Sequence, residues 1–186
     1  MKTIHHVLCF AFILLISAGC IPVRIDGPYE GRVIDADTNN PIEGAVVSGS
    51  WYKEEATPAG SASTYYDSYE TLTDKDGKFR IPGRGLLLFT EIRDVDFSIF
   101  KAGYEQLEPN PWKGLRTWGI DDSITWQGEK GTFKLRRLSL AEREKRVVHS
   151  LSVPINKQRL FRLEYNKESK EIGSDSILPL EWNDES

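Results

Sequence analysis

Cys20 is the residue whose surroundings point most directly to a covalent chemistry. It follows three small residues, Ser17, Ala18 and Gly19, which allow the chain to lie extended in the cleft of a peptidase. Its thiol is a nucleophile that can accept an acyl group. An apolar run of ten residues, 7–16, precedes them and is too short to cross a bilayer core about 30 Å thick. The pattern is typical of a secretory signal peptide.

The segment that ends at Cys20 resembles the signal of bacterial lipoproteins with its lipobox. The resemblance implies that the signal peptide, residues 1–19, is cleaved after Gly19. It also implies a diacylated Cys20 and a third acyl chain on the new amine. Ser17 stands where the motif most often has Leu. Ile21 replaces the Asp that signals retention at the inner membrane, so we expect a lipid anchor in the cell envelope at the outer membrane. The alternative is an ordinary signal peptide with an incidental cysteine.

The mature chain is poor in residues that bind metals or perform nucleophilic catalysis. Without residues 1–19, Cys20 is its only cysteine and His149 its only histidine. A zinc site needs three or four protein ligands, and a Ser–His or Cys–His system would depend on His149 alone. We therefore assign no catalytic residue, no metal ligand and no cofactor, and expect a protein that is not an enzyme. His149 is expected at the surface near the end of a helix, where a positive charge interacts favourably with the helix dipole.

The carboxylates suggest two further kinds of site. Four aspartates beside predicted turns are candidate calcium ligands: Asp35, Asp37, Asp74 and Asp76. Aspartates in turns also accept hydrogen bonds from nearby amides, and we favour that interpretation. The adjacent pairs at 54–55 and 121–122 would point to opposite sides of an extended chain. They make poor acid–base couples, so a carboxylate-dependent hydrolase is the least supported function.

Three tryptophans are the candidate binding residues: Trp112, Trp118 and Trp126. They lie among Pro and Gly in residues 105–131, and their faces can stack on sugar rings or pack against a partner protein. The alternative is that they form a small apolar cluster that holds a long insertion in place. We favour the packed interpretation for at least two of the three.

The charge of the chain limits its partners. Removal of Lys2 with the signal peptide leaves 23 basic and 28 acidic residues, a net charge of −5. This balance argues against nucleic acid, whose phosphates require a concentrated basic face. The partners that remain are the membrane, through Cys20, and an envelope protein or glycan.

The elements expected to position these residues are mainly strands. Residues 20–28 predict a tether, and residues 29–138 contain seven or so short segments of strand pattern separated by turn formers. Residues 53–68 and 105–131 interrupt them, and we expect a long loop at 53–68. Alternation predicts the following core residues: Val33, Ala45, Val47, Trp51, Phe79, Ile81, Phe97 and Ile99.

Residues 139–173 change to a helical pattern. Ser139 and Glu142 predict a capping box at the start of a helix at 140–151. The basic residues at 143–146 alternate with glutamates, which indicates a solvated helix face. The residues expected to face the domain are Leu140, Val147, Val148 and Leu151.

A second helix is predicted at residues 157–172. Asn156 is its expected N-cap and Gly173 its terminating residue. Leu160 and Leu163 are expected to share its apolar side. Residues 174–186 are acidic and predict a loose tail.

Four segments carry a family resemblance: residues 31–35 (GRVID), 38–47 (TNNPIEGAVV), 73–81 (TDKDGKFRI) and 101–104 (KAGY). In this order, within residues 29–104, they resemble a carboxypeptidase regulatory-like domain, a sandwich similar to transthyretin. The family takes its name from an appendage of metallocarboxypeptidases, but no peptidase domain and no His-x-x-Glu pair is present here. Stand-alone domains of this kind on bacterial lipoproteins resemble accessory or binding modules of the envelope.

We therefore expect a mainly β fold, a seven-stranded antiparallel transthyretin-like or Ig-like β-sandwich with a C-terminal helical extension. The expected function is that of a membrane-anchored, non-catalytic binding or structural module of the cell envelope. A glycan-binding accessory protein that uses the tryptophan insertion is the alternative. The carboxylate-dependent hydrolase is the second alternative.

Overall fold

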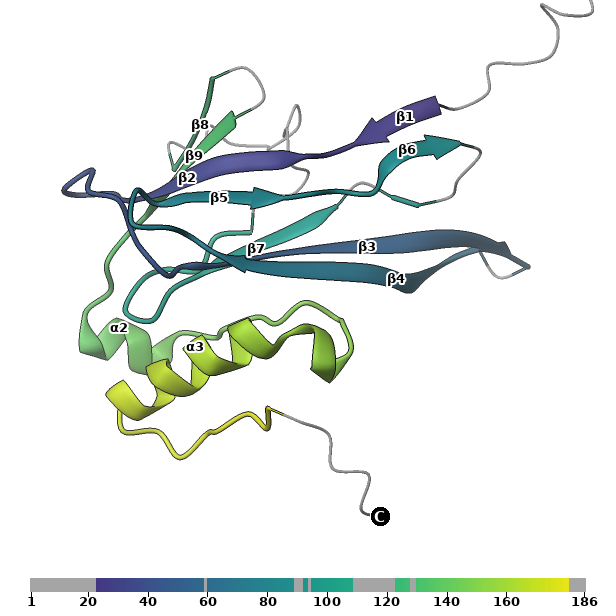
Figure 1. The fold of residues 1–186 in the computed structure, drawn as a ribbon. Helices are drawn as coiled ribbons and strands as arrows, with labels where there is room; N and C mark the ends of the chain where they lie inside the picture. The colour runs from purple at the N-terminus through teal and green to yellow at the C-terminus, as the bar shows by residue number, and fades with distance from the viewer. Residues whose placement is uncertain are drawn as a thin grey trace, which may run out of the picture.

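The structure is a computed structural model that describes residues 23–58, 60–88, 92–93, 95–108, 123–127 and 130–180. The fold is mainly β (Figure 1). Its strands are β1 (Val23–Asp26), β2 (Tyr29–Asp35), β3 (Val46–Thr57), β4 (Gly60–Leu72), β5 (Lys78–Ile81), β6 (Gly85–Leu88), β7 (Asp96–Phe100), β8 (Ile124–Gln127) and β9 (Lys130–Leu135). They form a four-stranded sheet of order β5–β2–β9–β8, a three-stranded sheet of order β4–β3–β7, and a two-stranded ribbon of β1 and β6.

The apolar core lies between the two larger sheets (Figure 1). Period-two alternation produces it: in β5, Phe79 and Ile81 are buried whereas Lys78 and Arg80 are exposed. All eight core residues predicted from alternation are buried in this cluster, so that prediction is confirmed. No helix among the described residues is long and apolar enough to span a membrane.

One strand pair contradicts the antiparallel order that we predicted. β2 and β9 run parallel, with Val33 opposite Phe133, whereas the other paired strands run antiparallel. Parallel strands need a long crossover between them, and most of the sandwich separates β2 from β9 in the chain. Alternation places a side chain on a face but does not encode the direction of the neighbouring strand, so the sequence prediction was wrong on this point.

The loop predicted at residues 53–68 is instead the outer half of a long hairpin. β3 and β4 pair along their lengths, with a register shift between Trp51 and Tyr52. Most side chains beyond that shift are exposed, and the rings of Tyr52 and Tyr65 meet edge-on at 6.4 Å. The polar composition of this segment is typical of a loop, which explains the wrong prediction. Thr and Tyr nevertheless favour strands, and backbone hydrogen bonds pair β3 with β4.

The tether predicted at residues 20–28 is also partly wrong. Val23–Asp26 forms β1, which pairs antiparallel with β6. Its residues alternate between apolar and charged, which is a strand pattern in a segment too short to decide the matter alone. Residues 20–22 lie outside the described residues.

The first predicted helix is shorter than expected. α2 covers Leu140–Lys145 and does not reach residue 151. The capping box is confirmed: the Glu142 carboxylate accepts hydrogen bonds from the backbone N–H of Ser139 at 2.8 Å and from its hydroxyl at 2.7 Å.

The predicted apolar face of this helix was wrong in part. Leu140 and Val147 are exposed. Val148 packs against the second apolar cluster, and Leu151 is partly buried. Because α2 ends before Val147, these residues do not share a helical face.

The second helix comprises a short 3₁₀ turn, η1 (Ile155–Lys157), and α3 (Arg159–Glu171). Gln158, not Asn156, precedes α3, so the predicted N-cap was wrong. Gly173 ends the helix with a φ of 70°, as predicted. The expected apolar side was also wrong in part, because Leu163 is exposed whereas Phe161 is buried.

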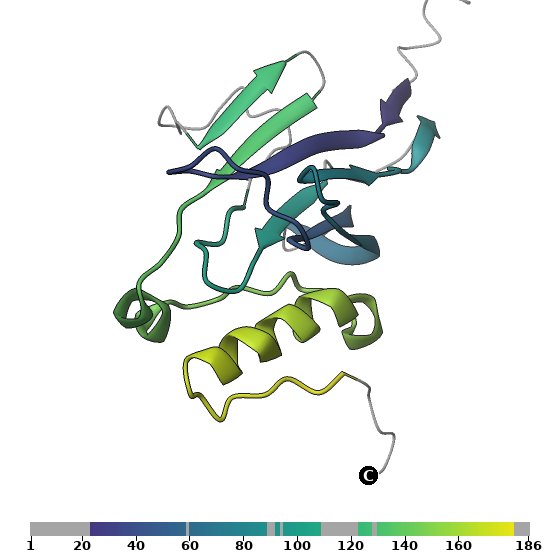
Figure 2. The same ribbon diagram turned by 60° about the vertical axis from the view of Figure 1, so that its left-hand side comes forward.

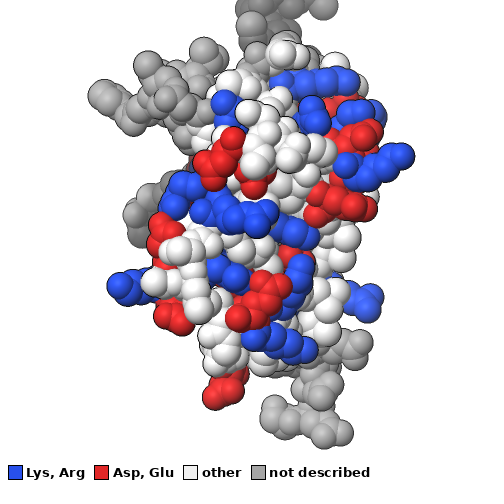
Figure 3. All heavy atoms as spheres, turned by 90° about the vertical axis from the view of Figure 1, so that its left-hand side faces the viewer, with Lys and Arg blue, Asp and Glu red and all other residues white. Residues whose placement is uncertain are grey.

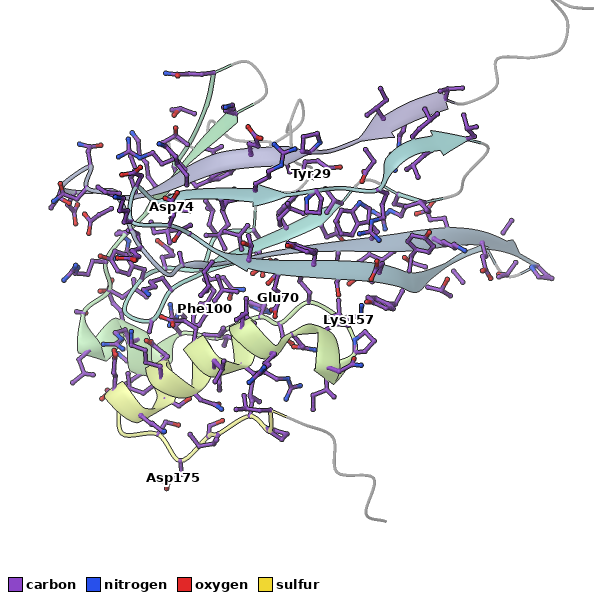
Figure 4. The ribbon with its side chains drawn as sticks, viewed as in Figure 1. Tyr29, Glu70, Asp74, Phe100, Lys157 and Asp175 are labelled. Carbon is purple, nitrogen blue, oxygen red and sulfur yellow. The ribbon has the colours of Figure 1, made fainter. Side chains whose placement is uncertain are left out.

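α3 covers the outer face of the β4–β3–β7 sheet, so the molecule has three layers (Figures 1 and 2). Phe161 packs with Val46 of β3 and Phe100 of β7 in a second apolar cluster. The start of α3 is held by Glu70 of β4, whose carboxylate accepts hydrogen bonds from the backbone N–H groups of Leu160 at 2.8 Å and Phe161 at 3.1 Å (Figure 4). These bonds satisfy donors that a helix N-terminus otherwise leaves unpaired.

The tail predicted to be loose is partly ordered. Over residues 174–180 the chain runs back along α3 (Figure 2). The side-chain amide of Asn166 donates to the carbonyl of Leu178 at 2.8 Å and accepts from its N–H at 2.7 Å. Residues 181–186 lie outside the described residues.

Candidate functional site

The residues that the sequence singled out for function lie largely outside the described part of the chain. Cys20, Trp112 and Trp118 are not among the described residues. Trp126 lies in β8, where its backbone pairs with Gly131, but its side chain is not described. The site is therefore built from the described residues that border the tryptophan insertion.

Two hollows flank residues 105–108, the first part of the predicted insertion. The first has a volume of about 550 Å³ and lies between this segment and α2. The second has a volume of about 510 Å³ and is bordered by β9 and by Ser123, where the described chain resumes. Glu105, Gln106 and Arg136 line both hollows. Residues 109–122 of the insertion, which lie outside the described residues, follow Glu108 in the wall of the first hollow and precede Ser123 in the wall of the second.

Paired charges line the first hollow. The Arg136 guanidinium contacts the carboxylates of Glu105 at 3.1 Å and Glu142 at 2.9 Å. Hydrogen bonds from Ser139, together with Arg136, lower the pKa of Glu142 to about 2, so this carboxylate is ionised at physiological pH. Figure 3 shows the side of the molecule that carries α2, where acidic and basic side chains alternate over the surface.

Gln106 connects this segment to the chain after α2. Its side-chain amide donates to the carbonyl of His149 at 2.6 Å and to the hydroxyl of Ser98 at 2.8 Å, and it accepts from the backbone N–H of His149 at 2.9 Å. His149 itself is exposed, as expected. It lies beyond Lys145, where α2 ends, so the predicted interaction with a helix dipole was wrong.

These hollows offer donors and acceptors of both charge signs beside apolar surface from Leu107, Leu138 and Val147. Such a lining suits a polar ligand with apolar faces, because a few fixed polar groups orient a ligand while apolar surface supplies contact.

The four aspartates considered as calcium ligands take part in turns. Asp35 accepts hydrogen bonds from the backbone N–H groups of Thr38 and Asp37, both at 3.0 Å, and from the hydroxyl of Tyr104 at 3.1 Å. These bonds, chiefly that from the Thr38 backbone, hold the pKa of Asp35 below its ordinary value.

Asp74 plays the same part in the turn before β5. It accepts from the backbone N–H groups of Asp76 at 2.9 Å and Lys78 at 2.8 Å. Within the described ranges, no group of three or more His, Cys, Asp or Glu residues is placed to hold a metal ion.

A buried ionic cluster joins the helices to the sandwich, and the sequence did not predict it. Glu168 of α3 is only 3% exposed, and its carboxylate binds Arg143 through two bonds of 3.0 and 2.6 Å and Arg146 through one of 2.6 Å. It also accepts from the N–H of Gly103 at 2.8 Å. The solvated face predicted at 143–146 was therefore wrong for these two arginines, which are 14% and 10% exposed.

A second buried carboxylate lies where the ribbon joins the sandwich. Asp26 accepts hydrogen bonds from the hydroxyl of Tyr29 at 2.6 Å, the indole N–H of Trp51 at 2.9 Å and the backbone N–H of Arg84 at 2.7 Å. The Arg84 guanidinium lies over the Trp51 ring, 4.6 Å from its centroid, and pairs with Asp67. Sequence analysis placed Trp51 in the core but gave no signal for its partner.

Comparison with known proteins adds little to this geometry. No protein-family model matches the chain, and no curated protein does. Among solved structures, one described as a streptococcal ancillary pilin is similar, with a TM-score of 0.30 and 17% identity. The match covers 61% of this chain, which spans only 30% of the pilin chain. A likeness this distant carries no argument about fold family or function.

Proposed function

We propose that this protein is a lipoprotein of the bacterial cell envelope, held at the outer membrane through Cys20. Its folded part acts as a non-catalytic binding or structural module. The lipobox-like sequence before Cys20 supports the anchor. Each CH₂ group buried in the bilayer contributes about 0.8 kcal/mol, and a single acyl chain gives only marginal, reversible binding. Stable anchoring therefore needs two or more chains. Three chains on Cys20 would meet this requirement.

The observation that carries the non-catalytic assignment is how the interior carboxylates are used. Asp26, Asp35 and Glu168 are each buried and bonded to backbone N–H groups or to side chains of other elements. Glu70 caps α3 in the same way. These groups hold strands, turns and helices together, which supports the role of a rigid scaffold that presents its surface to a partner.

We also propose that the sandwich is of the transthyretin-like kind. Support comes from the four family-like segments and from the seven strands that make up the two larger sheets. The ribbon of β1 and β6 is additional to those seven.

A glycan-binding role is the second candidate. The two hollows favour it because Trp112 and Trp118 lie in the chain between Glu108, which lines the first hollow, and Ser123, which lines the second. Aromatic side chains beside such hollows could stack on sugar rings. The Arg136 guanidinium, which has donors beyond those that Glu105 and Glu142 use, could bind hydroxyl groups.

Replacement of Cys20 tests the anchor. The Cys20→Ser protein is expected to move from the detergent phase to the aqueous phase of a membrane extract, because the thiol that follows the lipobox-like sequence is gone. Cys9→Ser is the matched control, since Cys9 lies in the signal segment and its loss should leave partitioning unchanged. Detergent-phase partitioning of Cys20→Ser equal to that of the wild type would refute the proposed function.

A further inference from the structure

The ribbon of β1 and β6 has one apolar face and one polar face. Val23 pairs with Leu88 and Ile25 pairs with Leu86, so these four side chains lie together on one face. We call these four residues the ribbon patch. The other face carries Arg24 opposite Leu87, which is buried. Alternation along both strands therefore separates a face directed at the protein from a face directed away from it.

The ribbon patch is exposed to an unusual degree. Val23, Ile25, Leu86 and Leu88 are 55%, 77%, 61% and 51% exposed. Single exposed aliphatic residues are common on proteins, but adjacent ones that form a contiguous apolar surface mark an interaction site. Four branched aliphatic side chains in two cross-strand pairs form such a surface.

The ribbon is held firmly rather than loosely attached. At its base, Asp26 is bonded to Tyr29, Trp51 and the backbone of Arg84. On its inner face, the Arg24 guanidinium donates to the carbonyls of Ile92 and Arg93, both at 2.8 Å. The patch is thus presented in a fixed orientation, at the end of the sandwich away from α2 (Figures 1 and 2).

The ribbon patch begins close to Cys20 in the chain, and this position indicates what covers it. Val23 follows Cys20 by three residues, a reach of at most about 11 Å. The polar layer on each side of a bilayer core is roughly 5–8 Å thick. If Cys20 is acylated, as the proposed function holds, Val23 begins within or just above this layer. An apolar patch at that height meets lipid before it meets any other apolar phase.

We propose that the ribbon patch lies against the lipid surface, with its four side chains in the interfacial layer. This inference rests on the proposed acylation of Cys20. The patch then acts as a second contact with the membrane and sets the orientation of the domain. In that orientation α2 and the hollow beside it lie away from the bilayer, accessible to an envelope partner.

Site-directed spin labelling tests this placement on the full lipidated protein. The mature chain has no other cysteine once Cys20 is acylated, so Ile25→Cys or Leu86→Cys each provides a single thiol. Leu163→Cys is the matched control, an exposed aliphatic position on α3 that is 44% exposed. The labelled proteins are reconstituted into phosphatidylethanolamine–phosphatidylglycerol vesicles. Accessibility to oxygen, which concentrates in lipid, is compared with accessibility to a water-soluble nickel chelate.

The expected result is an oxygen-to-nickel accessibility ratio several-fold higher at positions 25 and 86 than at position 163. Equal ratios at all three positions would overturn the inference. Protection of 25 and 86 from both reagents would also overturn it and would indicate a protein partner or a second copy. Thermal unfolding of each labelled variant, matched to the wild type, establishes that the ribbon is intact.

Intact mass of the same samples separates this inference from the proposed function. Acylated Cys20 with water-exposed labels refutes the membrane contact alone. An unacylated Cys20 refutes the proposed function, and the membrane contact with it.

Discussion

Replacement of Glu168 by Gln is the perturbation whose effect can be worked out most fully from the structure. Gln keeps the shape of the side chain and one acceptor oxygen but removes the negative charge. Arg143 and Arg146, which are 14% and 10% exposed, then lose their shared carboxylate. Removal of one partner of a buried ion pair typically costs about 3–5 kcal/mol, because it leaves uncompensated buried charge. The retained acceptor places the expected loss near 3 kcal/mol.

Glu171→Gln is the control within the same cluster. Glu171 also binds Arg143, at 2.6 Å, but is 41% exposed. Pairs exposed to this extent contribute about 0–1 kcal/mol. We therefore predict that Glu168→Gln lowers the free energy of unfolding much more than Glu171→Gln does, although both are the same chemical change on one helix. The free energy of unfolding is measured by urea denaturation at pH 7. The slope of its dependence on urea concentration should be the same in all three proteins.

The pH dependence provides an independent check. Burial acts to raise the pKa of Glu168, but the bonds from Arg143, Gly103 and Arg146 outweigh it, and the pKa is lowered below 4.5. A lowered pKa in the folded state means that the stabilisation is complete above pH 4.5 and is lost as the pH falls through the folded-state pKa. The difference in free energy of unfolding between the wild type and Glu168→Gln should become smaller in that acidic range. A difference below about 1 kcal/mol at pH 7, or one that is independent of pH, would refute the reasoning.

Two further predictions concern the core and the insertion. Phe79→Ala, a large-to-small change in the core cluster, should lower the free energy of unfolding by about 3–5 kcal/mol, and a loss below about 1 kcal/mol in denaturant melts would contradict the placement of β5. If at least two of Trp112, Trp118 and Trp126 are packed, their fluorescence should be blue-shifted and poorly quenched by acrylamide, with alanine substitutions lowering stability. Quenching of all three like free tryptophan, with substitutions that abolish glycan binding and leave stability intact, would favour the glycan-binding candidate.

Features determined by short stretches of chain were predictable from the sequence. Alternation in β5 identified Phe79 and Ile81 as core residues. The turn before β5 was equally legible: Gly77 has a φ of 74°, and a Cβ there would lie 2.3 Å from the carbonyl oxygen of Val33. Only glycine fits such a position.

Features that depend on contacts between distant segments were not predictable. The direction of β9 beside β2 and the side of α3 that carries Phe161 depend on which surfaces meet in the folded chain. The same holds for Glu168, whose partner Gly103 is 65 residues away. In the sequence, a glutamate on an amphipathic helix resembles an ordinary solvated residue. The role of Glu168 becomes apparent only when Arg143 of α2 and the chain that follows β7 lie beside it.

For the candidate site, the sequence named the tryptophan insertion but not the hollows beside it. The first hollow arises where Glu105 meets Arg136 and Glu142, which lie about 30 residues or more further along the chain. The ribbon patch was missed for a related reason. Val23 and Ile25 resembled part of a tether until β6 supplied their cross-strand partners.

The central claim, that the protein is anchored through Cys20, is tested most directly by the mass of the N-terminal peptide of the protein extracted from membranes. The account predicts a chain that begins at Cys20, with a diacylglyceryl group on its sulfur and a fatty acid on its amine. A chain that begins elsewhere, or a Cys20 with a free thiol, would contradict it.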